Sequence, residues 1–199
     1  MKRKHIFRAL AVSLIGLFLI SCAAREALPN YFLLTHGSTG RTRSGQSGGT
    51  GVFVRRVDVP AYLAKGRLVT LKGGIQVEYA TTAGWAEPLD QGVARAVAED
   101  LNRNSRIRAY GFSPESPLVD HKYDVWVRLE RFEGNDNGEV VLRAHWAVSN
   151  ADSSEPIASR TVDIRRHGWQ PGDYPGLVRL LSAELAEMSR EIARSIPAT

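Results

Sequence analysis

The sequence predicts an α+β fold, a mainly antiparallel β-sheet with two amphipathic α-helices packed on one of its faces. Several segments alternate apolar and polar residues with a period of two, which is typical of strands that bury one face. Two other segments, starting at Leu89 and Leu177, repeat apolar residues every three or four positions, which indicates amphipathic helices. The pair Asn137-Gly138 between two alternating segments favours a hairpin, because both residues tolerate the positive φ of a tight turn.

The part of the chain before residue 80 predicts short strands. We expect them at residues 31–34, 52–59, 67–71 and 75–79. Residues 35–51 are rich in glycine and poor in apolar side chains, which is typical of a loop. Pro60 should end the second strand, because proline cannot donate a backbone hydrogen bond. Lys72-Gly73-Gly74 should join the last two strands.

After Trp85 the periodicity becomes helical. Apolar residues then recur every four positions, at Leu89, Val93, Val97 and Leu101. We expect this helix to include Pro88 in its first turn and to end near Asn104. Residues 107–112 return to an extended pattern.

Three longer strands and a second helix complete the expected fold. The strands cover residues 123–132, residues 140–148 and the neighbourhood of Val162 and Ile164. The residues expected on the buried face of the first two strands are Tyr123, Val125, Val127, Leu129, Val140, Leu142, Ala144, Trp146 and Val148. The long C-terminal helix is predicted from Leu177, Leu181, Leu185, Met188, Ile192 and Ile196.

The N-terminus has the layout of a secretory signal peptide. Basic residues precede an apolar run at 9–20 that is too short to span a bilayer as a helix. Leu19-Ile20-Ser21-Cys22 resembles the lipobox of bacterial lipoproteins, in which the cysteine is acylated after cleavage. We therefore expect a signal peptide at 1–21 and a lipidated tether at 22–30. Ala23 is not the aspartate that retains such proteins in the inner membrane of Gram-negative cells, so the resemblance implies an outer-membrane anchor facing the periplasm.

Removal of a signal peptide changes the charge of the protein. The full chain has a net charge of +5, but residues 1–21 contribute four of its 26 basic side chains and none of its 21 acidic ones. The remainder has a net charge of +1, which does not favour nucleic acid as a partner. Residues 31–199 are long enough for a single periplasmic domain. Cys22 is the only cysteine, which excludes an intramolecular disulfide; the alternative to lipidation is a secreted protein with a chance cysteine.

Three patterns resemble catalytic or metal sites, and each has a plainer interpretation. Residues 45–49 match the G-x-S-x-G pattern of serine hydrolases but lack the buried strand and the helix that should flank Ser47. Residues 133–139 lack the spacing of a calcium loop, so we interpret them as an exposed hairpin turn. His121, His145 and His167 spread along the expected sheet and cannot share one ion. We therefore expect no catalytic residue, cofactor, metal or enzymatic activity, and a hydrolase is the least favoured alternative.

Several short motifs follow the lipobox in a recognisable order. They are Tyr31-Phe32-Leu33-Leu34, Val57-Asp58-Val59-Pro60-Ala61-Tyr62-Leu63, Trp85-Ala86-Glu87-Pro88-Leu89, Arg131-Phe132-Glu133-Gly134 and Leu142-Arg143-Ala144-His145-Trp146. Arg95 and Leu101-Asn102 lie along the helix that follows the third motif. This order resembles the PqiC/YmbA family, the auxiliary lipoproteins of ABC-type and MCE-protein transport systems. The resemblance covers nearly all of the chain after the tether, and only the glycine-rich segment 35–51 lies outside it.

The resemblance implies a non-enzymatic auxiliary subunit of a system that moves lipids between the inner and outer membranes. The implied partners are the outer membrane, through N-terminal acyl chains, and an MCE-domain protein of the inner membrane, with phospholipid as a further candidate. A part that docks on a symmetric ring is expected to be a homo-oligomer, because matching symmetry multiplies weak contacts. The alternative is a periplasmic lipid-binding carrier lipoprotein, which would hold its ligand in its own apolar cavity.

One segment combines apolar residues with a turn, and we take its side chains as candidate contacts for a partner. They are Val59, Pro60, Tyr62 and Leu63. The alternative is that these side chains pack under the sheet. We expect Trp85, Glu87 and Pro88 to build the start of a helix rather than to contact a partner.

Overall fold

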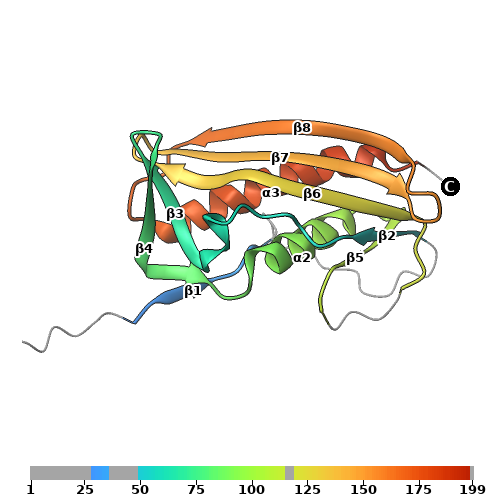
Figure 1. Cartoon of the computed structure of the whole chain (residues 1–199), viewed down its shortest axis with the longest axis horizontal. Coiled ribbons are helices and arrows are strands. Elements are labelled where there is room, and N and C mark those ends of the chain that lie inside the picture. Colours follow the sequence, from blue (N-terminus) through green and yellow to red (C-terminus); the bar gives the residue numbers. More distant parts are fainter. Residues whose placement is uncertain (1–27, 36–48, 115–118, 198–199) are drawn as a thin grey trace, which may run out of the picture.

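An eight-stranded sheet forms the body of the molecule, and the helices α2 and α3 cover one of its faces (Figure 1). The computed structural model describes residues 28–35, 49–114 and 119–197, so Cys22 and Ser47 lie outside the described residues. The elements are β1 (Asn30–Phe32), β2 (Thr50–Val54), the 3-10 helix η1 (Leu63–Lys65), β3 (Arg67–Lys72), β4 (Gln76–Trp85), α2 (Leu89–Leu101), β5 (Ile107–Gly111), β6 (Tyr123–Asn135), β7 (Glu139–Asn150), β8 (Pro156–His167) and α3 (Tyr174–Ser195). The predicted α+β class is confirmed.

The strand β6 is the centre of the sheet. It pairs along one edge with β7, which pairs with β8, and these three strands form an antiparallel meander. The other edge of β6 is shared, because β2 pairs with its beginning and β3 with its end, both in parallel. The sheet continues from β2 to β5 and from β3 to β4 and β1. The long ladders are the antiparallel ones, so the prediction of a mainly antiparallel sheet is confirmed.

Both helices form where the apolar periodicity predicts them. The helix α2 begins directly after Pro88, and it ends at Leu101, because Asn102 and Asn104 turn the chain toward β5. At the start of α3 the carboxylate of Asp173 accepts a hydrogen bond from the backbone N–H of Gly176 at 3.0 Å, which caps the helix. Among the described residues, neither helix is both long and apolar enough to cross a membrane.

The predicted inward faces of β6 and β7 are buried against the helices, as at Leu129 and Val140. A β-bulge between Leu129 and Arg131 then shifts the alternation by one residue. Phe132 and Gly134 therefore face the core in place of Arg131. The ring of Trp169 lies so close to Gly134 that a Cβ at this position would be 2.7 Å from it.

Two of the predicted strands differ most from the structure, while several others begin or end a few residues from the expected bounds. The strand expected at 52–59 divides, because β2 ends at Val54 and only a single bridge joins Asp58 to Arg128 of β6. Between them the chain bulges, because the backbone N–H groups of Arg55 and Asp58, three positions apart, bond to β6 carbonyls only two positions apart. The strand expected at 75–79 is longer, because β4 continues to Trp85 and its last residues pair with β1.

The hairpin between β6 and β7 lies where Asn137-Gly138 predicts it, but its turn is of a different kind. Only Gly138 has a positive φ, of 75°. The amide oxygen of Asn135 accepts hydrogen bonds from the backbone N–H groups of Asn137 and Glu139, both at 3.0 Å. The loop therefore spans three residues, and the glycine alone takes the left-handed conformation.

Candidate functional site

Three of the sequence motifs come together at one place, which we call the motif junction. Residues 57–63 lead from β2 into η1, residues 85–89 join β4 to α2, and residues 131–134 lie in the second half of β6. Side-chain contacts connect the first motif to the third and the second to the third. Residues that are far apart in the sequence thus build one site.

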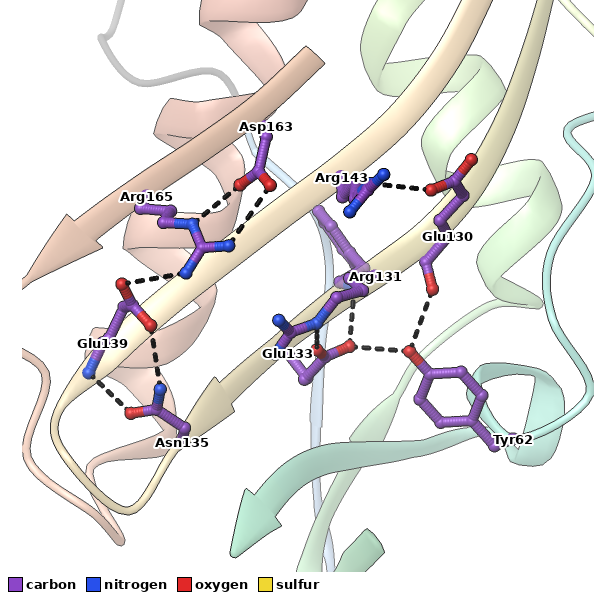
Figure 2. Close-up of polar contacts among 10 residues, drawn as sticks. Tyr62, Glu130, Arg131, Glu133, Asn135, Glu139, Arg143, Asp163 and Arg165 are labelled. Atoms are coloured by element: carbon purple, nitrogen blue, oxygen red, sulfur yellow. Dashed lines mark hydrogen bonds and ion pairs between the residues drawn. The ribbon is translucent and has the colours of Figure 1, made fainter. Parts of the chain in front are cut away.

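Glu133 is the buried anchor of the motif junction and has no exposed surface. Its carboxylate accepts hydrogen bonds from the Tyr62 hydroxyl at 2.8 Å, from Nε of Arg131 at 2.6 Å and from the backbone N–H of Phe132 at 2.8 Å (Figure 2). The Tyr62 hydroxyl also lies 3.2 Å from the carbonyl oxygen of Glu130. Because a buried carboxylate needs such partners, Glu133 ties the segment before η1 to β6.

Tyr62 acts as a fixed hydrogen-bond donor. Burial raises the pKa of its hydroxyl well above the usual value, and the negative charge of Glu133 raises it further. The hydroxyl is therefore protonated at any physiological pH. Among the described residues, the one carboxylate that it binds is already paired with Arg131, so this arrangement offers no free base to activate a nucleophile.

The second motif reaches the junction through an aromatic contact. The rings of Trp85 and Phe132 stack, with centroids 6.2 Å apart and an angle of 26° between their planes. Trp85 also pairs with Phe32 of β1, so this contact links the edge of the sheet to its centre. Pro88 and Glu87 then lead directly into α2, as we expected for the start of a helix.

Arg95 fastens the same region from α2. Its guanidinium donates to Glu87 at 2.6 Å, to Glu99 at 3.0 Å and to the backbone carbonyl of Leu34 at 3.1 Å. Burial opposes its positive charge, but the hydrogen bond to Glu87 and the charges of Glu99 and Glu87 outweigh burial and raise its pKa. Arg95 therefore stays charged and holds the segment after β1 against the start of α2.

Asn102, which belongs to the order of motifs described above, has a structural role. Its side-chain amide donates to the carbonyl oxygen of Ala109 and accepts from the N–H of the same residue, both at 2.8 Å. The amide thus takes the place of a strand neighbour for β5 and fixes that strand against the end of α2.

An open groove of about 880 Å³ lies over the motif junction. Its walls are residues 56–59 and 64–66 on one side and residues 85–90 on the other. Arg56 pairs with Asp90 across the groove at 2.8 Å, and Asp58 pairs with Arg128 of β6 at 2.7 Å. These two ion pairs are satisfied within the protein, and the lining also contains apolar residues such as Val59, Ala64 and Ala86. Such a surface suits a segment of another protein better than a small charged molecule.

The candidate contact residues have different exposures. Val59 lines the groove, and Val59, Pro60 and Tyr62 are all half-buried. Leu63 is only 2% exposed and packs in the core, so it supports the turn from inside. A partner contact at Val59, Pro60 and Tyr62 stays a prediction. Sequence reasoning did not place Trp85, Glu87 and Pro88 in the same groove, because nothing in the local periodicity reports that distant motifs meet.

The three histidines lie apart from one another, and of them His167 lies beside the acidic segment, 3.9 Å from the Glu139 carboxylate. In the described ranges 28–35, 49–114 and 119–197, no three His, Cys, Asp or Glu side chains gather as a metal ion requires. His121 contacts Asp124 at 3.1 Å, while His145 contacts Thr161 at 3.2 Å at a different level of the sheet. In the loop after β6, Asp136 accepts a hydrogen bond from the N–H of Gly73 at 2.9 Å, which joins two turns.

Comparison with known families gives one match that covers most of the chain. Residues 32–193 match the model of the family described as ABC-type transport auxiliary lipoprotein component. The chain is 26% identical over 187 residues to the intermembrane transport lipoprotein PqiC of Escherichia coli K12, covering 92% of this chain and 96% of that protein. The PqiC of Shigella flexneri matches with the same identity and coverage.

Solved structures share the fold. An uncharacterized protein has a TM-score of 0.70 at 23% identity, covering 85% of this chain and 99% of its own. Protein XCC0632 of Xanthomonas campestris has a TM-score of 0.63 at 16% identity, covering 82% of this chain and 92% of its own. At these identities the likeness concerns the fold alone, and it supports the arrangement of strands and helices described above.

Proposed function

The chain belongs to the family of ABC-type transport auxiliary lipoprotein components, and on this basis we propose that it is a non-enzymatic auxiliary subunit of an MCE/ABC-type intermembrane lipid transport system. The observation that supports this most is the extent of the family match, which runs from β1 to the last turns of α3. The relative PqiC, which matches this chain over almost the whole length of both proteins, is an intermembrane transport lipoprotein, and this agrees with the proposal. The motif junction supports a binding role rather than catalysis, because its polar groups are committed to one another.

In this proposal Cys22 is the anchor of the protein. Residues 1–21 are removed as a signal peptide, Cys22 is acylated, and residues 22–30 tether the periplasmic domain 31–199 to the outer membrane. The strand β1 begins at Asn30, eight residues after Cys22. Eight extended residues span about 28 Å at most, so the domain stays close to the membrane surface.

We place the contact with an MCE-domain protein of the inner membrane in the groove over the motif junction. Val59 offers apolar surface there, the half-buried Pro60 follows it directly in the chain, and Tyr62 holds the turn in position through Glu133. Assembly into a homo-oligomer would repeat this groove around a ring and multiply weak contacts with a symmetric partner. Phospholipid is then the cargo of the assembled system.

The test is affinity purification of the full-length acylated protein from gently solubilised membranes, with bound proteins and lipids identified by mass spectrometry. We expect an MCE-domain protein to be recovered with the wild type and lost with Cys22→Ser, which cannot be acylated. Recovery of the protein alone with one phospholipid per chain would instead favour the lipid-binding carrier. Native mass spectrometry of the same sample tests oligomerisation, and a purely monomeric species would contradict it.

A groove variant tests the position of the contact. Val59→Asp places a charge on the apolar wall of the groove, whereas Ala61→Asp places the same charge on an exposed residue of the same turn outside it. We expect Val59→Asp to lose the partner and Ala61→Asp to retain it, with both variants folded by circular dichroism. If both variants recovered equal amounts of the partner, the contact would have to lie outside the groove.

A further inference from the structure

A second hollow of about 620 Å³ lies between the end of α2 and the second half of α3, and we call it the basic pocket. Its lining contains one acidic residue, Asp100, and three alanines, at positions 183, 186 and 193. The other charged residues of its lining are all arginines. They are Arg103, Arg106, Arg166, Arg190 and Arg194. This excess of positive charge contrasts with the balanced ion pairs of the groove over the motif junction.

Few of these arginines are neutralised within the protein. Arg103 lies 3.7 Å from Asp100, and Arg166 donates to Glu187 at 2.5 Å. The Nε of Arg166 is buried and has no hydrogen-bond partner among the described residues. Arg106, like Arg190 and Arg194, forms no ion pair with any residue in the described ranges. Within the described part of the chain, Asp100 is the one acidic residue of the lining, and its charge is offset by Arg103.

The two arginines that α3 contributes to the pocket form no ion pair along the helix within the described residues. Arg190 and Arg194 are four residues apart, and like charges at this spacing repel each other on a helix. Two acids of the same helix, Glu187 and Glu191, instead pair with arginines of β8. In this half of α3, Arg190 and Arg194 thus line the pocket, while the acids nearest to them are paired on the β8 side.

We propose that the basic pocket binds a phosphate group. Several guanidinium groups that line one hollow match the multiple acceptor oxygens and the negative charge of a phosphate group, and arginine forks bind phosphate in a bidentate manner. The alanine floor leaves room beside the arginines for an apolar portion of the ligand. The phosphate is carried either by the headgroup of an anionic phospholipid or by a small soluble molecule. This proposal concerns a different surface from the groove, and it does not depend on the proposed transport role.

Calorimetric titration of the full-length acylated protein in a neutral detergent at low salt tests the proposal. The three probes are inorganic phosphate, dihexanoyl phosphatidylglycerol and dihexanoylglycerol, which lacks phosphate. We expect at least one phosphate-bearing probe to bind and dihexanoylglycerol not to bind. Tighter binding of the phosphatidylglycerol than of inorganic phosphate would identify a lipid headgroup, and the reverse order would identify a soluble phosphate ligand.

The double variant Arg190→Gln with Arg194→Gln should weaken this binding by about tenfold or more, because each lost charge-assisted hydrogen bond contributes to affinity. The matched control is Arg108→Gln with Arg179→Gln, which removes the same charge from exposed positions outside the pocket. Thermal unfolding checks that both variants fold. Absence of binding by both phosphate-bearing probes, equal binding of dihexanoylglycerol, or equal effects of the two double variants would each overturn the proposal.

Discussion

Two glutamates of this protein are equally buried, but their surroundings differ. Glu133 and Glu184 both have no exposed surface. Glu133 at the motif junction binds Arg131, Tyr62 and a backbone N–H, whereas neither carboxylate oxygen of Glu184 on α3 has a hydrogen-bond partner among the described residues. Burial raises the pKa of Glu184 to about 8, and the charge of Arg166 lowers it only in part. Buried Glu133 therefore links neighbouring segments through its hydrogen bonds, whereas buried Glu184 is a neutral group at pH 7 whose ionisation makes stability depend on pH.

Removal of the Glu133 carboxylate should have the largest effect. Glu133→Ala leaves the Arg131 guanidinium and the Tyr62 hydroxyl without their buried partner, and we expect a loss of about 4 kcal/mol in the free energy of unfolding. The matched control is Glu130→Ala on the same strand, which removes an exposed ion pair with Arg143 and should cost less than about 1 kcal/mol. Urea denaturation measures both values, and similar losses would show that Glu133 does not anchor the junction.

Removal of the Glu184 carboxylate should raise stability, whereas removal of the Glu133 carboxylate lowers it. Between its usual pKa of 4.5 and about 8, the folded protein retains a proton that the unfolded chain has lost. The free energy of unfolding therefore falls as the pH rises through this window and levels off above it. Because Glu184→Gln cannot ionise, the free energy of unfolding of the variant should exceed that of the wild type by about 4 kcal/mol at pH 8, with little difference at pH 4.5.

Urea denaturation at pH 4.5, 6 and 8 tests this prediction for Glu184. The charged groups around this residue are Arg166, Glu187, Glu139 and Glu133. Glu187→Gln is a suitable control, because this side chain lies on the same helix but is partly exposed and paired with Arg166. If Glu184→Gln followed the same pH dependence as the wild type, the carboxyl group would have to be ionised in the folded state at neutral pH.

Loss of the Tyr62 hydroxyl should have a smaller effect. Tyr62→Phe keeps the ring but removes one of the three donors to Glu133, which should lower the free energy of unfolding by about 1.5 kcal/mol. Tyr79→Phe is the control, since Tyr79 is exposed and its hydroxyl has no hydrogen bond with any described residue. Chemical denaturation measures the free energy of unfolding of both variants. If Tyr62→Phe lowered it as little as the control does, the hydroxyl of Tyr62 would contribute little, and Arg131 would be the side chain that holds Glu133 in place.

The smallest change is expected for an arginine of the basic pocket. Arg190 is exposed, and the like charge of Arg194 lies four residues away. Arg190→Gln should therefore leave stability unchanged or raise it by about 0.3 kcal/mol. A loss of more than about 1 kcal/mol in urea denaturation would mean that Arg190 supports the fold, and its charge would then not be available to a ligand.

Most of the regular structure follows from local patterns. The alternation of Val125, Val127 and Leu129 predicts a half-buried strand, and the four-residue repeat from Leu89 to Leu101 predicts α2. These patterns are reliable because burial of one face imposes a period on the sequence wherever the element packs. The antiparallel pairing of β6 with β7 also agrees with the local pattern, because the short turn at Asn137-Gly138 joins these two strands.

The candidate site is only partly visible in the sequence. The motifs 57–63 and 85–89 stand out by their order, but local patterns do not report that they line one groove. Glu133 was expected in an exposed turn, and it is buried because the bulge after Leu129 changes the phase of β6 and because Tyr62 covers its carboxylate. A shift of one residue in a strand exchanges its inward and outward side chains, and hydrophobic patterns do not report the bulge itself.

The sequence by itself determined the α+β class, the two amphipathic helices, the hairpin of β6 and β7 and the family to which the chain belongs. Only the tertiary structure decided that β2 and β3 share one edge of β6, that Leu63 lies in the core, and that five arginines surround one pocket. The reason is the range of the forces involved. Periodicity records the burial of each element against water, whereas parallel pairing, buried ion pairs and charge clusters depend on which distant segments become neighbours.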